Sequence, residues 1–225
     1  MRVLYHWPLD PGSRQARIAL AETRLKFKLE PINPWAPDDT FLSICAEGMP
    51  PALIDVTPDG KVVITGARAI CEYMHESSKK TPLLPEGIIE RAEARRLCDW
   101  FDKKFADEVN AFIMHERVEK TMMGGEPPDA SLLREGRDHL SVHLNYMTWL
   151  LERRDYLAGG SYSLADIAAA AHLSCLDFVD EIKWREWPVV KDWYQKIKSR
   201  PSVQPLLADR LGALIPPRHY RNLDF

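Results

Sequence analysis

The sequence has few cysteines, no long apolar run and no large excess of charge of either sign. Its 225 residues include four cysteines and no Cys-x-x-Cys pair, which argues against the usual zinc spacing and against a disulfide framework. No stretch approaches the roughly 18 apolar residues of a membrane helix, and the first apolar run ends early, at Pro8. The formal net charge of −3 provides no basic field for nucleic acid. We therefore expect a reduced cytoplasmic protein that binds neither nucleic acid nor a membrane.

The composition is that of a soluble globular chain, with 45% apolar and 28% charged residues. The sequence contains no Gly-rich phosphate loop and no nucleophile elbow. His139 and His143 have the i, i+4 spacing that could hold a metal from one face of a helix, but no third ligand accompanies them. We expect neither a metal nor another cofactor.

Strand and helix signals alternate in the first third of the chain. Strands are predicted at residues 3–7, 27–32, 52–56 and 61–64, and helices at residues 13–24 and 67–76. The tetrapeptide Thr57-Pro58-Asp59-Gly60 is a strong turn signal, so it predicts a hairpin of the last two strands. This order predicts an α/β unit in which helices cover a small mixed sheet.

Strand signals vanish after the polar, proline-containing segment 78–86, which is the best candidate for a linker. Apolar residues at helical spacing then predict helices over residues 89–121 and 133–151, a third from Ser163, a fourth near Pro188 and a short fifth after Pro201. Ser163 and Asp166 have the spacing of a capping box, which is a folding signal and not a catalytic one. The second part of the chain is predicted to be all-helical.

Five segments, in order along the chain, carry a family resemblance: LYHWPLDPGSRQARIALAE, GMPPALIDVTPDG, VVITGARAICEYM, LAGGSYSLADIAAAAHL and WPVVKDWYQKIKSRPSV. Together they resemble the glutathione S-transferase family. The resemblance implies a thioredoxin-like α/β domain at residues 1–77, a linker at 78–86, an all-α domain at 87–211 and a C-terminal extension at 212–225. It also implies a homodimer.

The positions that bind glutathione in that family hold unsuitable residues here. Asp10 stands where many members place a Ser or Cys that stabilises the thiolate, and a neighbouring carboxylate would oppose deprotonation of the thiol. Asp10 is suited instead to capping the N-terminus of the helix that follows it. Pro51 matches the family's cis-proline, but Pro50 before it has no N–H to donate to the ligand. Gly66 and Ala67 replace the Glu-Ser pair that holds the γ-glutamyl group. Each lost hydrogen bond to a charged group costs roughly 1.5–3 kcal/mol, so we expect this site to be degenerate.

These substitutions favour a binding protein without a catalytic residue. Two other interpretations stay open. In the first, the chain is an active transferase that uses an atypical residue, Tyr5 or Ser13. In the second, it is a carrier that holds an apolar ligand between Trp7 and Trp35.

Within the family, the chain resembles bacterial cell-division proteins that bind FtsZ polymers as dimers. That resemblance implies FtsZ filaments and a second copy of the chain as partners, further division proteins as additional candidates, and a cytoplasmic location at the division site. Exposed aromatic and arginine residues are typical of interaction surfaces. The candidate partner-binding residues are Trp35 in a proline-rich loop and, in the extension, Arg218, His219, Tyr220, Arg221, Asp224 and Phe225. We expect Trp35 and the extension to form one surface around the disused cleft.

Overall fold

The computed structural model describes residues 2–78, 81–212 and 214–224, and the chain divides into two compact units. The first unit contains Met1–Leu83 and Pro201–Asp209, and the second contains Leu84–Arg200 and Arg210–Phe225. Segment Pro201–Asp209 therefore packs with the first unit, although it follows the predicted helices of the second in sequence. The family-based domain limits stay a prediction.

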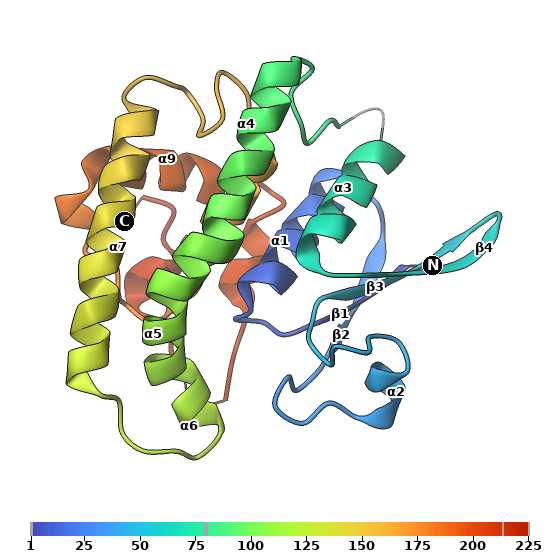
Figure 1. Cartoon of the computed structure of the whole chain (residues 1–225), viewed down its shortest axis with the longest axis horizontal. Coiled ribbons are helices and arrows are strands. Elements are labelled where there is room, and N and C mark those ends of the chain that lie inside the picture. The colour runs from blue at the N-terminus through green and yellow to red at the C-terminus, as the bar shows by residue number, and fades with distance from the viewer. Residues whose placement is uncertain (1, 79–80, 213, 225) are drawn as a thin grey trace. The chain divides into compact units, whose positions relative to one another are not determined.

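The first unit is built on a four-stranded sheet (Figure 1). Its strands are β1 (Arg2–His6), β2 (Phe27–Pro31), β3 (Ala52–Thr57) and β4 (Gly60–Thr65). The strand order is β2-β1-β3-β4, with β1 parallel to β2 and antiparallel to β3, and β3 antiparallel to β4. The predicted mixed sheet and its hairpin are confirmed.

The helices of the first unit are α1 (Pro11–Glu22), the short α2 (Asp39–Leu42) and α3 (Ala67–Ser77). Asp10 is the N-cap of α1, as its position before Pro11 predicts, and its carboxylate accepts a hydrogen bond from the Ser13 amide. Helices α1 and α3 pack against each other. Their buried apolar side chains and those of the sheet, such as Ile18, Ile70 and Leu53, form the core of this unit.

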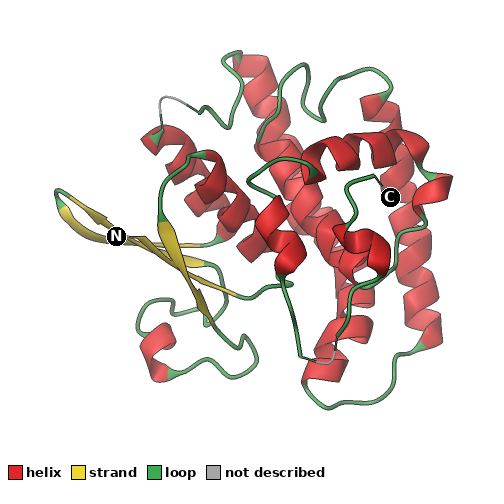
Figure 2. Cartoon of the chain, turned by 180° about the vertical axis from the view of Figure 1, so that it is seen from behind, coloured by secondary structure: helices red, strands yellow, loops and turns green. Residues whose placement is uncertain are grey.

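The second unit is helical, as Figure 2 shows. Its α-helices are α4 (Ile88–Asp99), α5 (Ala111–Met114), α6 (Lys120–Met122), α7 (Ala130–Leu151), α8 (Leu164–Phe178) and α9 (Pro188–Lys198). Helices α4 to α6 form one continuous helical run in which Trp100–Asn110 and His115–Glu119 are wider, π-helical turns. The predicted helix over 89–121 is confirmed, but nothing in the sequence predicted its wider turns. Short 3-10 helices occupy Trp184–Glu186, Gln204–Ala208 and Arg218–Arg221, and the second of these lies after Pro201 in the first unit.

Helix α8 is buried along its whole length. The predicted capping box starts it: the Ser163 side chain accepts from the backbone of α8, and Asp166 accepts from the Ser163 amide at 2.9 Å. Gly136 lets α7 approach α5 closely, since a Cβ there would lie 2.8 Å from Cγ1 of Ile113. Because every residue of α8 is buried, this helix lies in the interior of the helical core.

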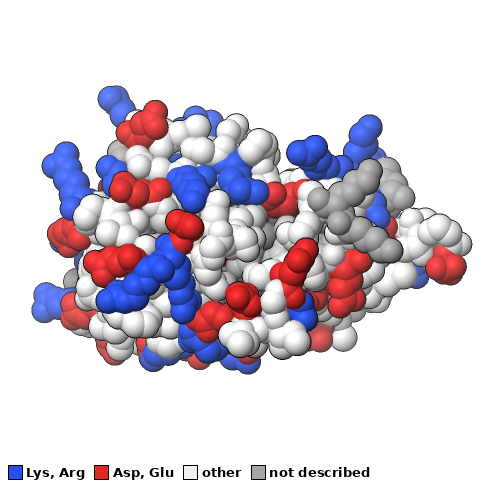
Figure 3. All heavy atoms as spheres, turned by 90° about the horizontal axis from the view of Figure 1, so that it is seen from above, with Lys and Arg blue, Asp and Glu red and all other residues white. Residues whose placement is uncertain are grey.

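Acidic and basic side chains alternate over the face shown in Figure 3, in keeping with the small net charge. Among the helices of the described ranges, none combines the length and the apolar character that a bilayer crossing demands.

Candidate functional site

The structure brings the predicted degenerate-site positions together in the first unit. They surround Gly12, near the start of α1. A Cβ built on Gly12 would lie 3.2 Å from Cδ of Pro51, 3.3 Å from Cβ of Ala67 and 3.3 Å from Oδ2 of Asp10. Pro50 and Gly66 are the chain neighbours of Pro51 and Ala67. The five positions, scattered in sequence, are thus one site in space.

Three backbone donors are missing from this site, because Pro50 and Pro51 have no N–H and the Gly66 amide is already engaged. The Pro50–Pro51 peptide bond is cis, as the resemblance implies. The Gly66 amide donates to the Pro51 carbonyl at 3.0 Å. Because Pro50 has no N–H, the strand-like pairing that needs a donor at this position cannot form.

The side chains of Asp10 and Ser13, near the start of α1, are also engaged. The Oδ2 atom of Asp10 accepts from the Ser13 amide at 2.5 Å, so this carboxylate serves as a helix cap. Ser13 is fully buried, and its Oγ accepts from the Trp7 amide at 3.1 Å. Tyr5 packs its ring 5.7 Å from that of Phe41. Burial of the Ser13 hydroxyl argues against the interpretation in which it activates a thiol.

Trp35 is half-buried in the loop between β2 and α2. Its amide donates to Oδ1 of Asn33 at 3.1 Å, which fixes the turn. Its ring meets the ring of the nearly buried Trp7 edge to face, with centroids 4.9 Å apart. The Trp35 ring therefore packs against Trp7 and is still partly exposed to solvent.

A cluster of buried basic side chains, His6 of β1 with Arg14 and Arg17 of α1, lies in the same unit. His6 and Arg14 are 4% and 0% exposed. Arg17 makes a two-point ion pair with Asp209, at 2.8 and 2.9 Å, and Nη2 of Arg14 lies 3.6 Å from the same carboxylate. Burial, with the neighbouring Arg17, lowers the pKa of His6 to about 4. His6 is therefore a neutral imidazole at physiological pH.

In the second unit, the C-terminal extension is anchored by Asp177, a fully buried carboxylate of α8. Its Oδ1 accepts from Nε1 of Trp184 at 2.8 Å and lies 3.1 Å from Nε2 of His219. Its Oδ2 accepts from the Tyr194 hydroxyl at 3.3 Å and from Nζ of Lys198 at 3.4 Å. Lys198 also donates to the His219 carbonyl at 3.2 Å. One buried acid thus ties the extension to α8 and α9.

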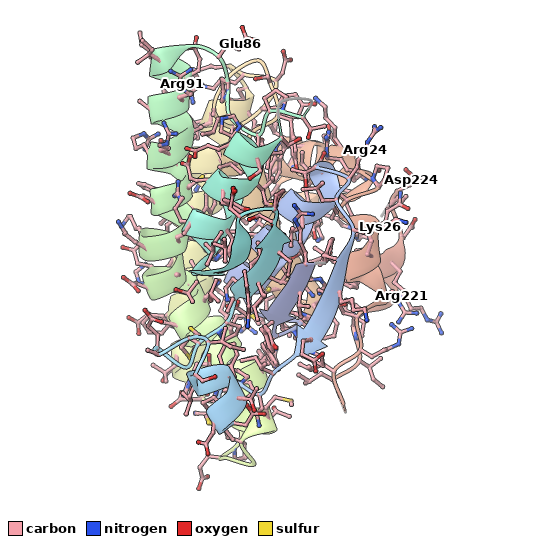
Figure 4. The ribbon with its side chains drawn as sticks, turned by 90° about the vertical axis from the view of Figure 1, so that its right-hand side faces the viewer. Arg24, Lys26, Glu86, Arg91, Arg221 and Asp224 are labelled. Carbon is pink, nitrogen blue, oxygen red and sulfur yellow. The ribbon has the colours of Figure 1, made fainter. Side chains whose placement is uncertain are left out.

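The extension residues predicted to bind a partner have different environments. Tyr220 is fully buried, with its ring 5.2 Å from that of Phe178, so it is an internal anchor and not the surface contact that the sequence suggested. Its aromatic ring finds a nonlocal apolar neighbour that composition alone does not reveal. Arg218, Arg221 and Asp224 are exposed, and Figure 4 shows the side chains of the latter two at the surface. His219 is 31% exposed, and Phe225 lies outside the described residues.

Two groups in the anchor have shifted ionisation. The hydrogen bond with Asp177 raises the pKa of His219, which favours its charged form. Burial lowers the pKa of Lys198, although the attraction of Asp177 opposes that effect. The pair of Lys198 and Asp177 is completely enclosed.

His139 and His143 do not form a joint site. His143 is buried, accepts at Nδ1 from Nε1 of Trp100 at 3.0 Å, and has Nε2 3.0 Å from Glu108. His139 is 40% exposed, 4.0 Å from Glu135. Among the residues that the structure describes, no cluster of three or more His, Cys, Asp or Glu side chains has a metal-binding arrangement.

Sequence reasoning missed the segment Lys183-Trp184-Arg185-Glu186-Trp187 and its connection to the extension. Trp184 and His219 both contact Asp177, and the cations beside Trp184 are exposed. Alternation of aromatic and charged residues in this segment was the available signal. The contact between this segment and the extension is made through Asp177, and local sequence patterns do not reveal that contact.

Two family models match the chain. The model of the glutathione S-transferase N-terminal domain matches residues 11–77, and that of the C-terminal domain matches residues 109–201. With the mixed sheet and the helical unit described above, these matches show that the chain belongs to the glutathione S-transferase family.

Similarity extends over the full length to individual relatives. FtsZ-localized protein A of Caulobacter vibrioides (strain NA1000 / CB15N) is 47% identical, with 100% of this chain and 98% of that protein covered. The structure of FzlA from C. crescentus matches with a TM-score of 0.98 at 47% identity, covering 100% of this chain and 99% of that one. A glutathione S-transferase from Rhodospirillum rubrum F11 matches with a TM-score of 0.95 at 43% identity, covering 100% of both chains.

Proposed function

We propose that the chain is a non-catalytic member of its family that binds FtsZ polymers, as a homodimer, and organises the division ring of a bacterial cell. The observation that carries this proposal is the 47% identity over the full chain to FtsZ-localized protein A. A dimer suits the task, because two identical sites gain avidity on a repeating filament without new contacts. The proposed location is the cytoplasm at the division site, and further division proteins are candidate partners.

The glutathione positions support the non-catalytic part of the proposal. Asp10 is engaged as a helix cap, Pro50 offers no N–H and the Gly66 amide is already donated to Pro51. Ala67 has no hydroxyl for a ligand carboxylate. A ligand that relied on these groups would lose several hydrogen bonds, each worth roughly 1.5–3 kcal/mol when a charge is involved.

Sedimentation with FtsZ tests the proposal directly. We expect the protein to co-sediment with FtsZ polymerised by GTP and to stay in the supernatant with unpolymerised FtsZ. Equal recovery in the two pellets, or recovery in neither, would contradict polymer binding.

An active transferase is the second candidate, favoured by the 43% identity to a protein from R. rubrum that is named a glutathione S-transferase. Retention on immobilised glutathione and turnover of a chlorinated aromatic acceptor would support it. We expect neither activity. If turnover occurs, Tyr5→Phe identifies the source, because the other candidate hydroxyl, Ser13, is buried.

Trp35 in the first unit and the exposed end of the extension in the second are each proposed to contact the partner. Trp35→Ala and Asp224→Lys are each expected to weaken co-sedimentation by about tenfold, a loss of about 1.4 kcal/mol. Asp59→Lys, in the exposed turn of the β3–β4 hairpin, is the matched charge control. Full binding by both variants, with unchanged thermal unfolding, would show that Trp35 and Asp224 do not contribute to partner binding.

A further inference from the structure

The second unit contains a groove beside the anchored extension. It lies along the 3-10 helix Trp184–Glu186 and the first turn of α9, and it has a volume of about 460 Å³. Buried Ile182 and Trp184 belong to its floor. The remaining lining residues are Lys183, Arg185, Glu186, Lys191 and His219.

The floor of the groove is rigid. The Trp184 ring stacks on that of Tyr194, with centroids 4.7 Å apart and planes 8° apart. Its Nε1 donates to the buried Asp177. Since these contacts already fix the ring, a ligand that packs on the exposed part of the floor need not order it.

The rim of the groove is predominantly basic. Lys183, Arg185 and Lys191 provide three cations, and Glu186 provides the single acid among the lining residues. Lys183 and Glu186 are 79% and 60% exposed and 3.9 Å apart, a geometry in which an ion pair contributes little. The positive character of the rim therefore persists despite the neighbouring acid.

The edge formed by His219 connects the groove to the extension. His219 belongs to the 3-10 helix Arg218–Arg221, whose two arginines are exposed. The acids that face His219 are Asp177, which is buried, and Asp180, whose Oδ1 lies 3.8 Å from Nε2 of His219. Lys198 of α9 contacts the same buried carboxylate. His219 thus links the basic rim of the groove to the exposed arginines of the extension within the second unit.

We propose that this groove docks an acidic segment of the filament partner, with one apolar side chain of that segment on the floor beside Trp184. Carboxylates on the segment would meet the rim cations Lys183, Arg185 and Lys191. The proposal rests on the proposed function, because it names the chemistry by which the filament is recognised. It makes His219 a shared residue of the extension and the groove.

Charge reversal tests the groove without disturbing its floor. The double variant Lys183→Glu/Arg185→Glu changes two exposed rim residues. The matched control Lys26→Glu/Lys28→Glu has the same spacing and the same change of charge at exposed positions outside the groove, and Lys26 is labelled in Figure 4. We expect the groove variant to bind FtsZ polymers at least about tenfold more weakly, and the control to bind within about twofold of the wild type. Thermal unfolding of both variants verifies that they fold.

Binding of a labelled peptide tests the groove without FtsZ, so the result does not depend on which protein is the natural partner. The probe is an eight-residue peptide of glutamates with one central leucine, and its companions replace the leucine by serine or the glutamates by lysines. We expect binding of the first peptide, with affinity that falls as salt rises, and weaker binding of both companions. The groove variant should bind the first peptide at least about tenfold more weakly than the control.

The outcomes distinguish two failures. If polymers bind but the groove variant matches the control in both assays, the groove proposal is overturned and the proposed function stands. If the peptide binds in the groove while FtsZ polymers do not bind the wild type, the proposed partner is wrong and the acidic-segment site stands. Failure of both peptide and polymer to bind the wild type overturns both.

Discussion

At the scale of single residues, His6 shows how a buried side chain can sense acid. The imidazole is enclosed beside Arg14 and Arg17, and its pKa is lowered to about 4 by burial and by these cations. In the unfolded chain an ordinary histidine has a pKa near 6.5. The unfolded state therefore binds the proton more readily, and stability from this group is present above pH 6.5 and lost as pH falls toward 4.

His6→Gln should flatten that part of the pH dependence. The wild type is expected to lose about 3 kcal/mol of unfolding free energy through this group between pH 6.5 and 4, and the variant is expected to lack this contribution. Chemical unfolding at several pH values measures the difference. Parallel curves for the two proteins over this range would contradict the assignment.

Single residues also mark what the sequence could and could not predict. Asp10 was recognisable as a cap because the cap, Pro11 and the Ser13 amide are near neighbours in sequence. Tyr220 was not recognisable as an anchor, because its burial depends on Phe178, about forty residues earlier in the chain. The glutathione positions fall between these cases: the resemblance predicted them individually, and the fold brings Asp10, Pro51 and Ala67 around Gly12.

At the scale of elements, helix α8 depends on the capping box at its start. Asp166 is fully buried and accepts from the amides of Leu157 and Ser163 and from Nε1 of Trp193. Burial raises the pKa of this carboxyl, and the hydrogen bonds oppose that change. The sequence predicted the box from its spacing, whereas the contacts with Leu157 and Trp193 are nonlocal.

Asp166→Ala should therefore cost more than the loss of a simple cap. It leaves three buried N–H donors without this acceptor, and we expect a loss of at least about 3 kcal/mol in unfolding free energy. Ser163→Ala removes one capping acceptor and should cost about 1 kcal/mol. Denaturant unfolding compares the two variants, and equal losses would mean that the nonlocal contacts of Asp166 contribute nothing.

The 3-10 helix Arg218–Arg221 is the second element with a specific dependence, because it is tied to α8 through His219 and Asp177. The pKa of His219 is raised by that hydrogen bond, with further attraction from Asp180 and opposition from Lys198. Its stabilising contribution is complete below the unfolded pKa near 6.5 and is lost as pH rises through the higher folded pKa.

Raising the pH from about 6.5 through the higher folded pKa of His219 should loosen the extension in the wild type. The same change should not loosen it in His219→Gln, because glutamine does not titrate. Hydrogen exchange of the Tyr220 and Asn222 amides measures the attachment, since both amides donate to backbone carbonyls of the extension. Exchange that follows the same pH dependence in both proteins, after correction for intrinsic rates, would refute the role of His219.

At the scale of the whole molecule, periodicity and turn signals predicted the mixed sheet and the helical second part, because both arise from local patterns. The position of Pro201–Asp209 in the first unit was not predictable in this way. Its attachment depends on Asp209 pairing with Arg17, 192 residues away, and on Ser202 donating to Glu22, 180 residues away.

A fragment that ends at residue 83 should consequently fail to form a stable first unit. It keeps Arg14 and Arg17 but loses Asp209, which pairs with both in the full chain. Removal of one partner from a buried charge pair costs roughly 3–5 kcal/mol, a large share of the stability of a small domain. Circular dichroism and thermal melting of the fragment provide the measurement, and a cooperative melt like that of the intact chain would contradict the expectation.

The place of Asp209 in the chain also has a consequence for synthesis on the ribosome. The sheet and α1, which carries Arg14 and Arg17, leave the exit tunnel well before their carboxylate partner Asp209, which lies 192 residues after Arg17 in the chain. At roughly 5–20 residues per second, the nascent sheet waits on the order of 10 seconds for that partner. During that interval it is a natural client for chaperones that hold unfinished chains.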